Sequence, residues 1–232
     1  TFFWDVKELP PGSQFELRLV DGSMSIQQYF ILDWNTSTER FSIAKAQSYI
    51  SQVRNSVVST IDSRLISDVP IGSCISGGID SSSIVGVVNR LMRQRTISQI
   101  GKQQKLFTAC YEQSSIDESN WAKLVVEKTG ADWYTVFPKP EEFVCDLEDL
   151  VHTQDFPFVS TSIYSQYRVM QLAHCANVKV LLDGQGGDEL FTGYAPFYIT
   201  YWLEILANGL IKSVKDELCH IQNTGIPVSD LV

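Results

Sequence analysis

The chain has 232 residues and a formal net charge of −9, from 18 Lys and Arg against 27 Asp and Glu. Hydrophobic residues make up 44% of it, which is enough to bury the core of a globular domain. The acidic balance excludes the basic face that nucleic-acid binding requires, and the short, interrupted apolar stretches exclude a membrane-spanning helix. We therefore expect neither nucleic acid nor a membrane as a partner.

The cysteines and the two chain ends indicate the setting of the protein. Five cysteines, odd in number and without CxxC spacing, predict neither a disulfide framework nor a zinc site, and so favour a reducing, cytoplasmic location. The chain opens at Thr1 without an initiator Met or a signal-peptide pattern, and it stops at Val232 within plausible structure. We expect an excerpt from a longer protein.

Residues 1–36 are predicted to form a short β-rich segment. A Pro-Pro-Gly turn signal at 10–12 precedes apolar residues that alternate at positions 15, 17 and 19. An Asp-Gly hairpin signal at 21–22 separates these from a second expected strand over 26–32. The first module is therefore expected to end before a second one, over residues 37–232.

In the second module, apolar residues at three- and four-residue spacing predict a long amphipathic helix from about residue 38 to residue 61. Strands and helices then alternate. The expected strands cover 69–75, 105–111, 133–137 and 178–182, and the expected helices cover 82–95, 141–152 and 161–176, with one more after a capping-box pattern at 115–118. This order predicts an α/β fold, a parallel sheet with helices on both faces, whose ligands bind beyond the carboxyl ends of the strands.

A turn with the sequence SGGIDSS, at residues 76–82, lies between the first of these strands and its helix. Adjacent glycines let the backbone approach a ligand closely, and the helix N-terminus that follows offers free N–H groups to phosphate oxygens. The serine hydroxyls add donors. An ordinary strand-to-helix turn explains the glycines and one serine, but it gives no reason for Asp80 among groups that attract an anion. We interpret Asp80 as a ligand of a phosphate-bound Mg²⁺.

A second glycine-rich segment, DGQGGDELF at residues 183–191, directly follows the fourth strand. It is expected at the same rim of the sheet as the first turn, where Asp188 and Asp80 would share one Mg²⁺ that bridges ATP phosphates. The alternative is a solvated turn followed by a helix with acids in its first turn, which the helix dipole favours on its own.

Other nucleotide-binding patterns fit poorly. No Lys follows the first glycines as the Walker pattern requires, and the GxGxxG pattern that begins at Gly184 fails at Glu189. Four aromatic residues at helical spacing are interpreted as core packing rather than the lining of a substrate pocket: Phe197, Tyr198, Tyr201 and Trp202.

SGGIDSS, preceded by SDVPIG at 67–72, and DGQGGDELFTGY at 183–194 together resemble the synthetase domain of glutamine-dependent asparagine synthetases. These enzymes belong to the PP-loop ATP pyrophosphatases, whose signature is SGGxD[ST]S. The segments at 117–118 and 152–158 are also similar to this family, and residues 1–32 resemble the tail of its N-terminal glutaminase domain. The likeness runs from residue 1 to about residue 198.

This resemblance implies a carbon–nitrogen ligase of asparagine biosynthesis. In the family reaction, the side-chain carboxylate of aspartate attacks the α-phosphorus of ATP and releases pyrophosphate, and ammonia made from glutamine then displaces AMP. The cofactors implied are ATP and Mg²⁺. The partners implied are small molecules, namely ATP, aspartate or another carboxylate, and ammonia, with a homodimer as the candidate assembly.

The resemblance also implies a role for each matched residue. The pyrophosphate would be held by Ser76, Gly77, Gly78, Asp80, Ser81 and Ser82, while Cys74 and Ala109 match positions whose backbone meets adenine. Asp183 and Gly184 match positions near the ribose and α-phosphate. Asp80 and Asp188 would bind Mg²⁺, and Tyr194 matches a tyrosine near the reaction centre. The expected catalytic set is Asp80, Asp188 and Tyr194.

Three departures from the family pattern leave alternatives open. The family's N-terminal Cys nucleophile and its catalytic Lys, which lies further toward the C-terminus, have no counterpart in this chain. Gln185 stands where many asparagine synthetases have Glu, and an amide cannot exchange a proton as a carboxylate can. The alternatives are a related amide ligase or a β-lactam synthetase-like cyclase acting on another carboxylate, and a non-catalytic nucleotide-binding remnant.

Overall fold

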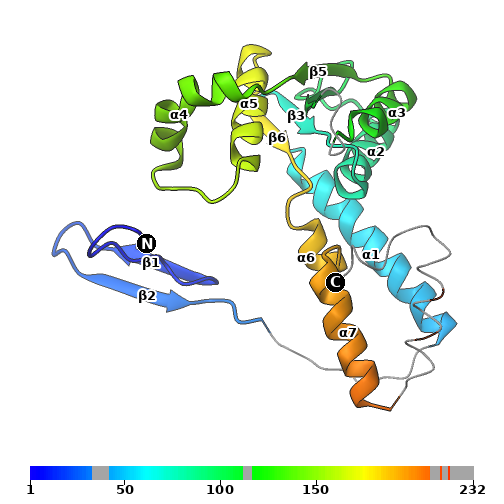
Figure 1. Ribbon diagram of the computed structural model, residues 1–232, viewed down its shortest axis with the longest axis horizontal. Coiled ribbons are helices and arrows are strands. Elements are labelled where there is room, and N and C mark those ends of the chain that lie inside the picture. Colours follow the sequence, from blue (N-terminus) through cyan, green and yellow to red (C-terminus); the bar gives the residue numbers. More distant parts are fainter. Residues whose placement is uncertain (33–41, 112–116, 210–214, 216–218, 220–232) are drawn as a thin grey trace.

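The structure of the chain is a computed structural model that describes residues 1–32, 42–111, 117–209, 215 and 219 (Figure 1). Its helices and strands form a small antiparallel hairpin, a parallel sheet with its helices, and two helices that extend below the sheet in Figure 1. The expected module boundary at residues 36 and 37 lies outside the described residues.

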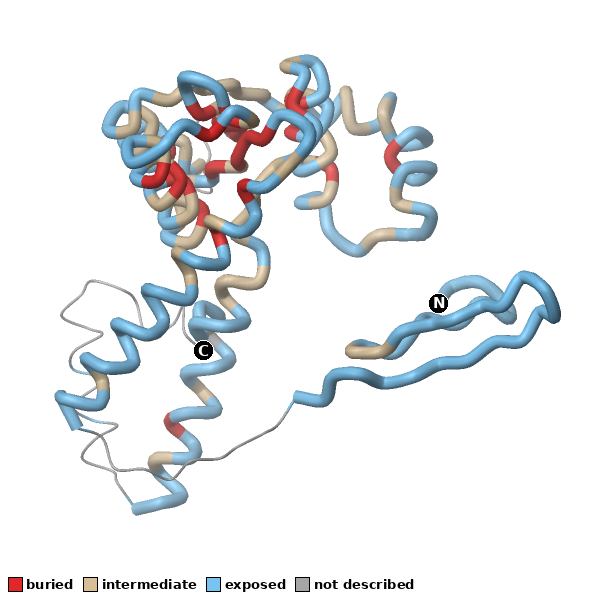
Figure 2. The backbone as a smooth tube through the Cα atoms, turned by 180° about the vertical axis from the view of Figure 1, so that it is seen from behind, coloured by how far each residue is buried: buried red, intermediate tan, exposed pale blue. Residues whose placement is uncertain are grey.

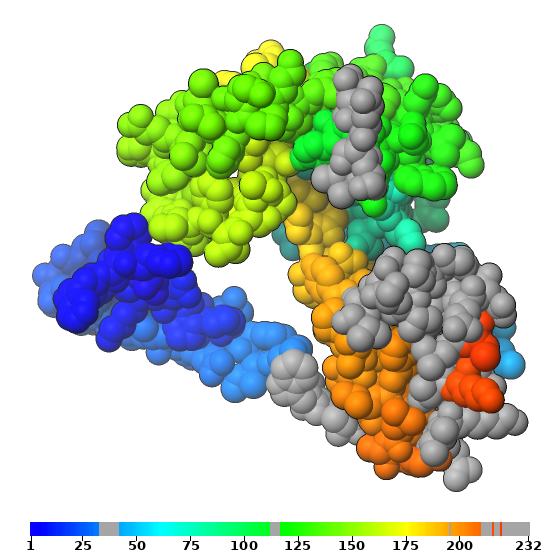
Figure 3. Space-filling model, in the orientation of Figure 1, coloured from blue at the N-terminus to red at the C-terminus, as the bar shows by residue number. Residues whose placement is uncertain are grey.

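The N-terminal segment forms the expected hairpin. Strand β1, Ser13–Leu17, pairs antiparallel with β2, Met24–Gln28, in a register that places Phe15 opposite Ile26 and Leu17 opposite Met24. These four apolar side chains share one face because strand residues alternate, while Gln14 and Gln27 lie opposite each other on the other face. All four are exposed. Figure 3 shows the hairpin to one side of the helices and the sheet.

Four parallel strands form the central sheet, in the order β5-β4-β3-β6. They are β3 Ile71–Cys74, β4 Lys105–Ala109, β5 Asp132–Val136 and β6 Val180–Leu182. Each predicted strand is therefore present, within a few residues of its expected ends. The α/β parallel sheet expected from the alternation of strands and helices is confirmed.

Helices cover both faces of this sheet. The helices of the described residues are α1 Ile43–Arg64, α2 Ile79–Gln94, α3 Ser119–Thr129, α4 Pro140–Gln154, α5 Ser162–Cys175, α6 Gly187–Phe191 and α7 Ala195–Ala207. On one face, α2 and α3 pack over Ile75 and Leu106. On the other face, Val169 and Ala173 of α5 pack over Phe107. Figure 2 shows that most buried residues lie around the sheet.

Two helix starts differ from expectation. Helix α2 begins at Ile79 rather than at residue 82, so that Asp80, Ser81 and Ser82 form its first turn instead of a loop. Helix α3 begins at Ser119 with Glu118 at its N-cap, so the expected capping box is displaced, and Ser115 itself lies outside the described residues. The carboxylate of Asp117 caps the start of α3, because it accepts hydrogen bonds from the Ser119 N–H at 3.3 Å and from the Ser119 hydroxyl at 2.7 Å.

Within the described residues, no helix combines the length and the apolarity needed to cross a bilayer. The longest helix, α1, presents a mostly exposed surface, and only Ile61 near its C-terminal end is buried.

Candidate functional site

The two glycine-rich segments lie at the carboxyl ends of neighbouring parallel strands. Strand β3 pairs with β4 on one side and with β6 on the other, with Ser73 opposite Leu182. The chain moves from β3 to β4 and β5 in one direction and reaches β6 only after returning to the other side of β3. Open α/β sheets bind ligands where the strand order reverses in this way. The fold thus places residues 76–78 and 183–186 next to each other at that point.

The first turn is braced by its own serines. The Ser81 hydroxyl accepts the Ser76 N–H at 3.2 Å, and the Ser76 hydroxyl accepts the Gly78 N–H at 3.2 Å. Gly77 adopts a φ of +101°, a conformation that residues with a side chain rarely adopt. Helix α2 follows with Gly78 at its N-cap, so its first-turn N–H groups and the positive end of its dipole face outward from the turn.

The second segment touches the first turn of α2. A Cβ at Gly184 would lie 2.9 Å from the Ser81 nitrogen and 3.1 Å from the Asp80 Cβ. Contacts this short are not tolerated, so a glycine is required for the two segments to approach each other. The observed contact explains why the second segment carries a glycine directly after Asp183.

Together the two segments line a cavity of about 630 Å³, a volume typical of small-molecule sites. Most of the residues that the sequence singles out lie on its wall. They are Ser76, Gly78, Asp80, Ser81, Asp183, Gly184, Asp188 and Tyr194. Gln185, Glu118 and Glu189 also contribute to the lining.

Four expected residues lie beside this cavity rather than on its wall. Gly77 provides the turn between Ser76 and Gly78. The hydroxyl of Ser82 is buried without a hydrogen-bond partner in the described part of the chain. Cys74 and Ala109 end strands β3 and β4 and pack against the α5 side of the sheet. Burial, with a smaller contribution from the nearby charge of Asp183, raises the pKa of the Cys74 thiol to about 12.

Asp80 and Asp188 approach the cavity from different elements, the first turn of α2 and the first turn of α6. No group of three His, Cys, Asp or Glu side chains is arranged to chelate a metal ion by itself, as far as the described residues extend. Mg²⁺ at phosphate sites is bound by one or two carboxylates together with waters and substrate phosphates. Two carboxylates on one cavity wall therefore fit Mg²⁺ that arrives with a nucleotide, rather than a permanently chelated metal.

Tyr194, at the N-cap of α7, extends over the same cavity. Its hydroxyl donates a hydrogen bond to Glu189 Oε1 at 3.1 Å. That hydrogen bond raises the pKa of Tyr194, and the charges of Glu189, Asp188 and Asp80 act in the same direction. The phenol therefore keeps its proton at neutral pH and can donate it to a hydrogen bond.

The aromatic residues of α7 divide between two roles. Trp202 is buried, which agrees with the core packing expected of this set. Phe197 and Tyr201 are exposed, and Tyr198, also exposed, lines the cavity, so the expectation of core packing is wrong for these three residues. Helical spacing alone could not separate the two, because it does not show which face of α7 is covered by other parts of the protein.

Sequence reasoning also missed Gln166 and Glu189. The Gln166 amide, on α5, donates to Asp183 Oδ2 at 3.5 Å, and Glu189 accepts the Tyr194 hydroxyl. Gln166 belongs to no sequence motif and reaches the site only through the packing of α5 on the sheet. Glu189 lies within the second segment, where its five-residue separation from Tyr194 was the available signal.

A second cavity, of about 880 Å³, borders the other side of residues 183–187. Its wall includes Val53 and Val57 of α1 and Ile84 of α2. Hydrocarbon walls cannot compensate for the lost hydration of a triphosphate. A triphosphate would therefore fit the first cavity better, where N–H groups, hydroxyls and carboxylates converge.

The sequence model of the family described as asparagine synthase matches residues 52–221. Asparagine synthetase [glutamine-hydrolyzing] 1 of Bacillus subtilis (strain 168) is 33% identical over 190 residues, which cover 82% of this chain and 27% of that protein. Amidase chyE of Penicillium rubens is 33% identical over 161 residues, covering 66% of this chain and 24% of that protein. Amidase chry2 of Gibberella zeae is 31% identical over 153 residues, covering 62% and 22%. The chain thus spans about a quarter of the length of the curated relatives it matches.

Proposed function

This chain belongs to the asparagine synthase family, and we propose that it forms the ATP-activating part of an amide-forming ligase. In this reaction, the side-chain carboxylate of aspartate attacks the α-phosphorus of ATP and pyrophosphate departs. Ammonia then attacks the aspartyl carbonyl carbon, and asparagine and AMP are released. The observation that carries the proposal is the meeting of SGGIDSS and DGQGGDE around one polar cavity at the point where the strand order reverses.

The first turn of α2 stabilises the departing pyrophosphate. Negative charge develops on the β-phosphate as the bond to the α-phosphorus breaks, and fixed N–H donors stabilise such charge without reorganising. The N–H groups that open α2 and the hydroxyls of Ser76 and Ser81 supply these donors. The glycines at 77 and 78 allow the phosphate to approach the backbone closely.

The carboxylates of Asp80 and Asp188 would hold Mg²⁺, which supplies charge neutralisation for the phosphates when it is bound. Tyr194 offers a protonated phenol at the same cavity, from where it orients the reacting groups. Asp183 and Gly184, directly after β6, border the ribose and the α-phosphate.

Residues 1–36 are proposed as the C-terminal tail of a glutamine amidotransferase domain, and residues 37–232 as part of the synthetase domain. The support is the hairpin itself. Its apolar face of Phe15, Leu17, Met24 and Ile26 is exposed in this chain, and a two-stranded hairpin needs further packing to be stable. Glutamine is accordingly proposed as the source of ammonia.

A second candidate differs only in the acceptor carboxylate. Two relatives at 33% and 31% identity carry the name amidase rather than asparagine synthetase. Gln185 lines the cavity where a Glu would offer an exchangeable proton. A ligase of this family that activates another carboxylate shares the AMP-forming step and differs in the product.

The test uses the protein expressed from its complete gene, with Mg²⁺, ATP, aspartate and ammonia, and quantifies AMP, ADP and asparagine together. Equal amounts of AMP and asparagine are expected. AMP without asparagine would support the second candidate. ADP alone, or no turnover with any carboxylate tried, would refute both candidates and favour a nucleotide-binding remnant. Asp80→Ala is the matched variant, expected to abolish AMP formation while its unfolding temperature stays close to that of the parent.

A further inference from the structure

Two glycines, one in the second segment and one just after it, lie against the two carboxylates of the site. Gly187 is the first residue of α6, and a Cβ there would lie 2.2 Å from Asp80 Oδ2 and 2.3 Å from its Cγ. Gly193 follows α6, and a Cβ there would lie 1.9 Å from Asp188 Oδ1 and 2.7 Å from its Cγ. All of these distances are far shorter than van der Waals contact.

Neither glycine is required by its own backbone. The glycines with positive φ are Gly12, Gly22, Gly77, Gly101, Gly130, Gly186 and Gly209, and the two at 187 and 193 are not among them. An alanine could therefore adopt the same backbone conformation at both positions. What it could not do is leave the neighbouring carboxylate in place, because the three nearest atoms at each position all belong to that one aspartate side chain.

We propose that Gly187 and Gly193 are positioning residues. Because they have no side chain, they leave room for the carboxylates of Asp80 and Asp188 at their positions on the cavity wall. Each glycine acts on the carboxylate of a different element, Gly187 across the gap to α2 and Gly193 within the chain that ends α6. That these carboxylates bind a metal ion rests on the proposed function. The steric contact between each glycine and its carboxylate is independent of it.

The nature of the clash predicts an unusual separation of effects. The atoms nearer than 3.0 Å are carboxylate atoms of side chains that can rotate, not backbone, so the fold can accommodate a methyl group by moving a carboxylate. A carboxylate that has moved no longer lies where it can share a metal ion with its partner. Gly187→Ala and Gly193→Ala should therefore weaken metal and nucleotide binding while leaving the fold intact.

The binding experiment uses the complete protein with Mn²⁺ as a paramagnetic substitute for Mg²⁺ and α,β-methylene-ATP, whose α–β bridge resists cleavage. Water-proton relaxation reports the Mn²⁺ concentration at half saturation. Gly187→Ala and Gly193→Ala are each expected to raise it about 10- to 100-fold, the usual loss when a residue that orients a metal ligand is changed. Gly86→Ala is the matched control, because a Cβ at this exposed position in α2 meets nothing within 4 Å.

A double variant separates positioning from a general structural defect. If Gly187 acts through Asp80, adding Gly187→Ala to Asp80→Ala should cause no further loss of Mn²⁺ binding, since the side chain that the methyl displaces is already absent. A further loss of the same size as in the parent background would overturn the assignment of Gly187.

Crystal structures of the two alanine variants test the steric relationship whether or not the protein turns out to be a ligase. Displacement of the Asp80 or Asp188 carboxylate, with the backbone of residues 183–194 unmoved, is the expected result. A carboxylate in its original place, or a displaced backbone, would overturn the proposal. Failure of the parent to bind Mn²⁺ with the nucleotide analogue would instead refute the proposed function, and the crystal structures would still decide the placement of the carboxylates.

Discussion

Cys74, the last residue of β3, lies beside Asp183, the first residue after β6, because the parallel register places Ser73 opposite Leu182. The two residues are thus neighbours at the ends of the two strands whose loops build the cavity. Burial is the main reason that the pKa of this thiol rises to about 12, and the charge of Asp183 adds to it. The neutral thiol is thus the form that the fold accommodates.

This raised pKa predicts a loss of stability at alkaline pH. The folded state holds the Cys74 proton more tightly than the unfolded state, whose thiol has a pKa of about 9. The contribution is therefore complete below pH 9 and is lost as the pH rises toward 12, by up to about 1.4 kcal/mol per pH unit. Urea unfolding between pH 8 and about 10.5 should show a steeper decline for the parent than for Cys74→Ser, which lacks the titrating thiol.

A parent and a Cys74→Ser variant whose unfolding free energies decline in parallel would contradict this account. Asp183→Asn offers an independent check, because removing the carboxylate removes one cause of the raised pKa. The thiolate fraction at a given pH then increases, so iodoacetamide should modify Cys74 faster in this variant than in the parent. Peptide mass spectrometry identifies the modified cysteine.

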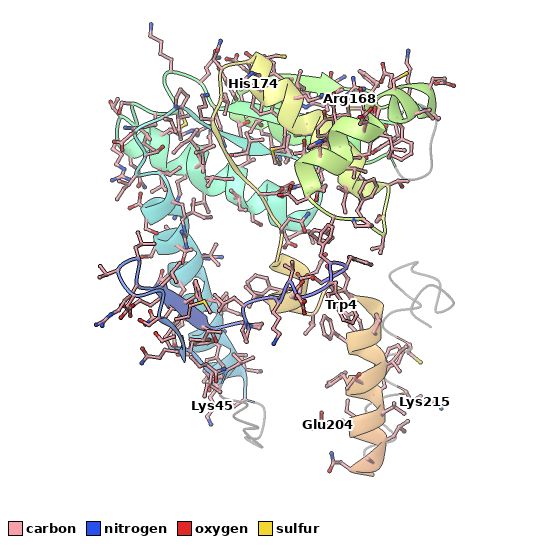
Figure 4. All side chains as sticks on the ribbon, turned by 90° about the vertical axis from the view of Figure 1, so that its left-hand side faces the viewer. Trp4, Lys45, Arg168, His174, Glu204 and Lys215 are labelled. Carbon is pink, nitrogen blue, oxygen red and sulfur yellow. The ribbon has the colours of Figure 1, made fainter. Side chains whose placement is uncertain are left out.

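Arg168, on α5, links this helix to α4 through hydrogen bonds. Figure 4 shows Arg168 far from Glu204 of α7. Its Nη1 donates to Glu142 Oε2 at 2.7 Å, to Asp146 Oδ2 at 3.3 Å and to the Tyr164 hydroxyl at 2.9 Å. Arg168→Met should lower the free energy of unfolding by about 1–3 kcal/mol, because it leaves the partly buried Asp146 and the buried Tyr164 hydroxyl without this donor.

The control for Arg168 is Arg95, which also pairs with an acid, Asp62, but at an exposed position. Arg95→Met should cost about 0–1 kcal/mol, as exposed ion pairs usually do. Urea unfolding of the two variants gives both values. Equal losses of unfolding free energy in the two variants would show that the α4–α5 hydrogen bonds of Arg168 stabilise the fold no more than an exposed ion pair does.

Much of the fold could be predicted from the sequence because the relevant patterns are local. Alternating apolar residues identified the hairpin, and the order of apolar runs and amphipathic segments identified a parallel sheet with helices on both faces. The start of α2 was predicted three residues too late. The prediction relied on apolar residues that face the core, and Ile79 does not belong to that buried face. The helix instead begins where Gly78 ends the turn, a boundary that depends on backbone conformation.

The site could be predicted only in part. Two motifs located Asp80 and Asp188, and the parallel strand order brought them to one cavity. Gln166 could not be found, because its contact with Asp183 depends on how α5 packs on the sheet. The steric role of Gly187 could not be found either. A glycine-rich sequence does not show whether a glycine serves a positive φ, a close backbone contact or a neighbouring side chain.

Gly77 provides a prediction that contrasts with Gly187. Its φ of +101° is strained for any other residue, and a Cβ would lie 2.6 Å from the Glu118 carbonyl oxygen and 2.9 Å from the Ala122 nitrogen. These are backbone atoms at the start of α3, which cannot move aside. Gly77→Ala should therefore lower the free energy of unfolding by at least about 1–3 kcal/mol from backbone strain alone. Gly86→Ala, measured in the same urea titration, should be neutral or stabilise the helix by up to about 1 kcal/mol. Equal stability of the two variants would contradict the observed packing of the first turn on α3.

Glu189 controls the ionisation of Tyr194 through the hydrogen bond of 3.1 Å between them. Because this bond and the charge of Glu189 both raise the pKa of Tyr194, Glu189→Gln should lower that pKa toward its usual value. Ultraviolet difference titration against a Glu189→Gln, Tyr194→Phe double variant isolates this one tyrosine and measures the change.

Tyr194→Phe should lower kcat for AMP formation about a hundredfold, the usual effect of removing one donor aimed at a reacting group. Its affinity for α,β-methylene-ATP should be unchanged, since the phosphates are held by α2. A loss of affinity with kcat retained would place Tyr194 at the nucleotide rather than at the reacting carboxylate.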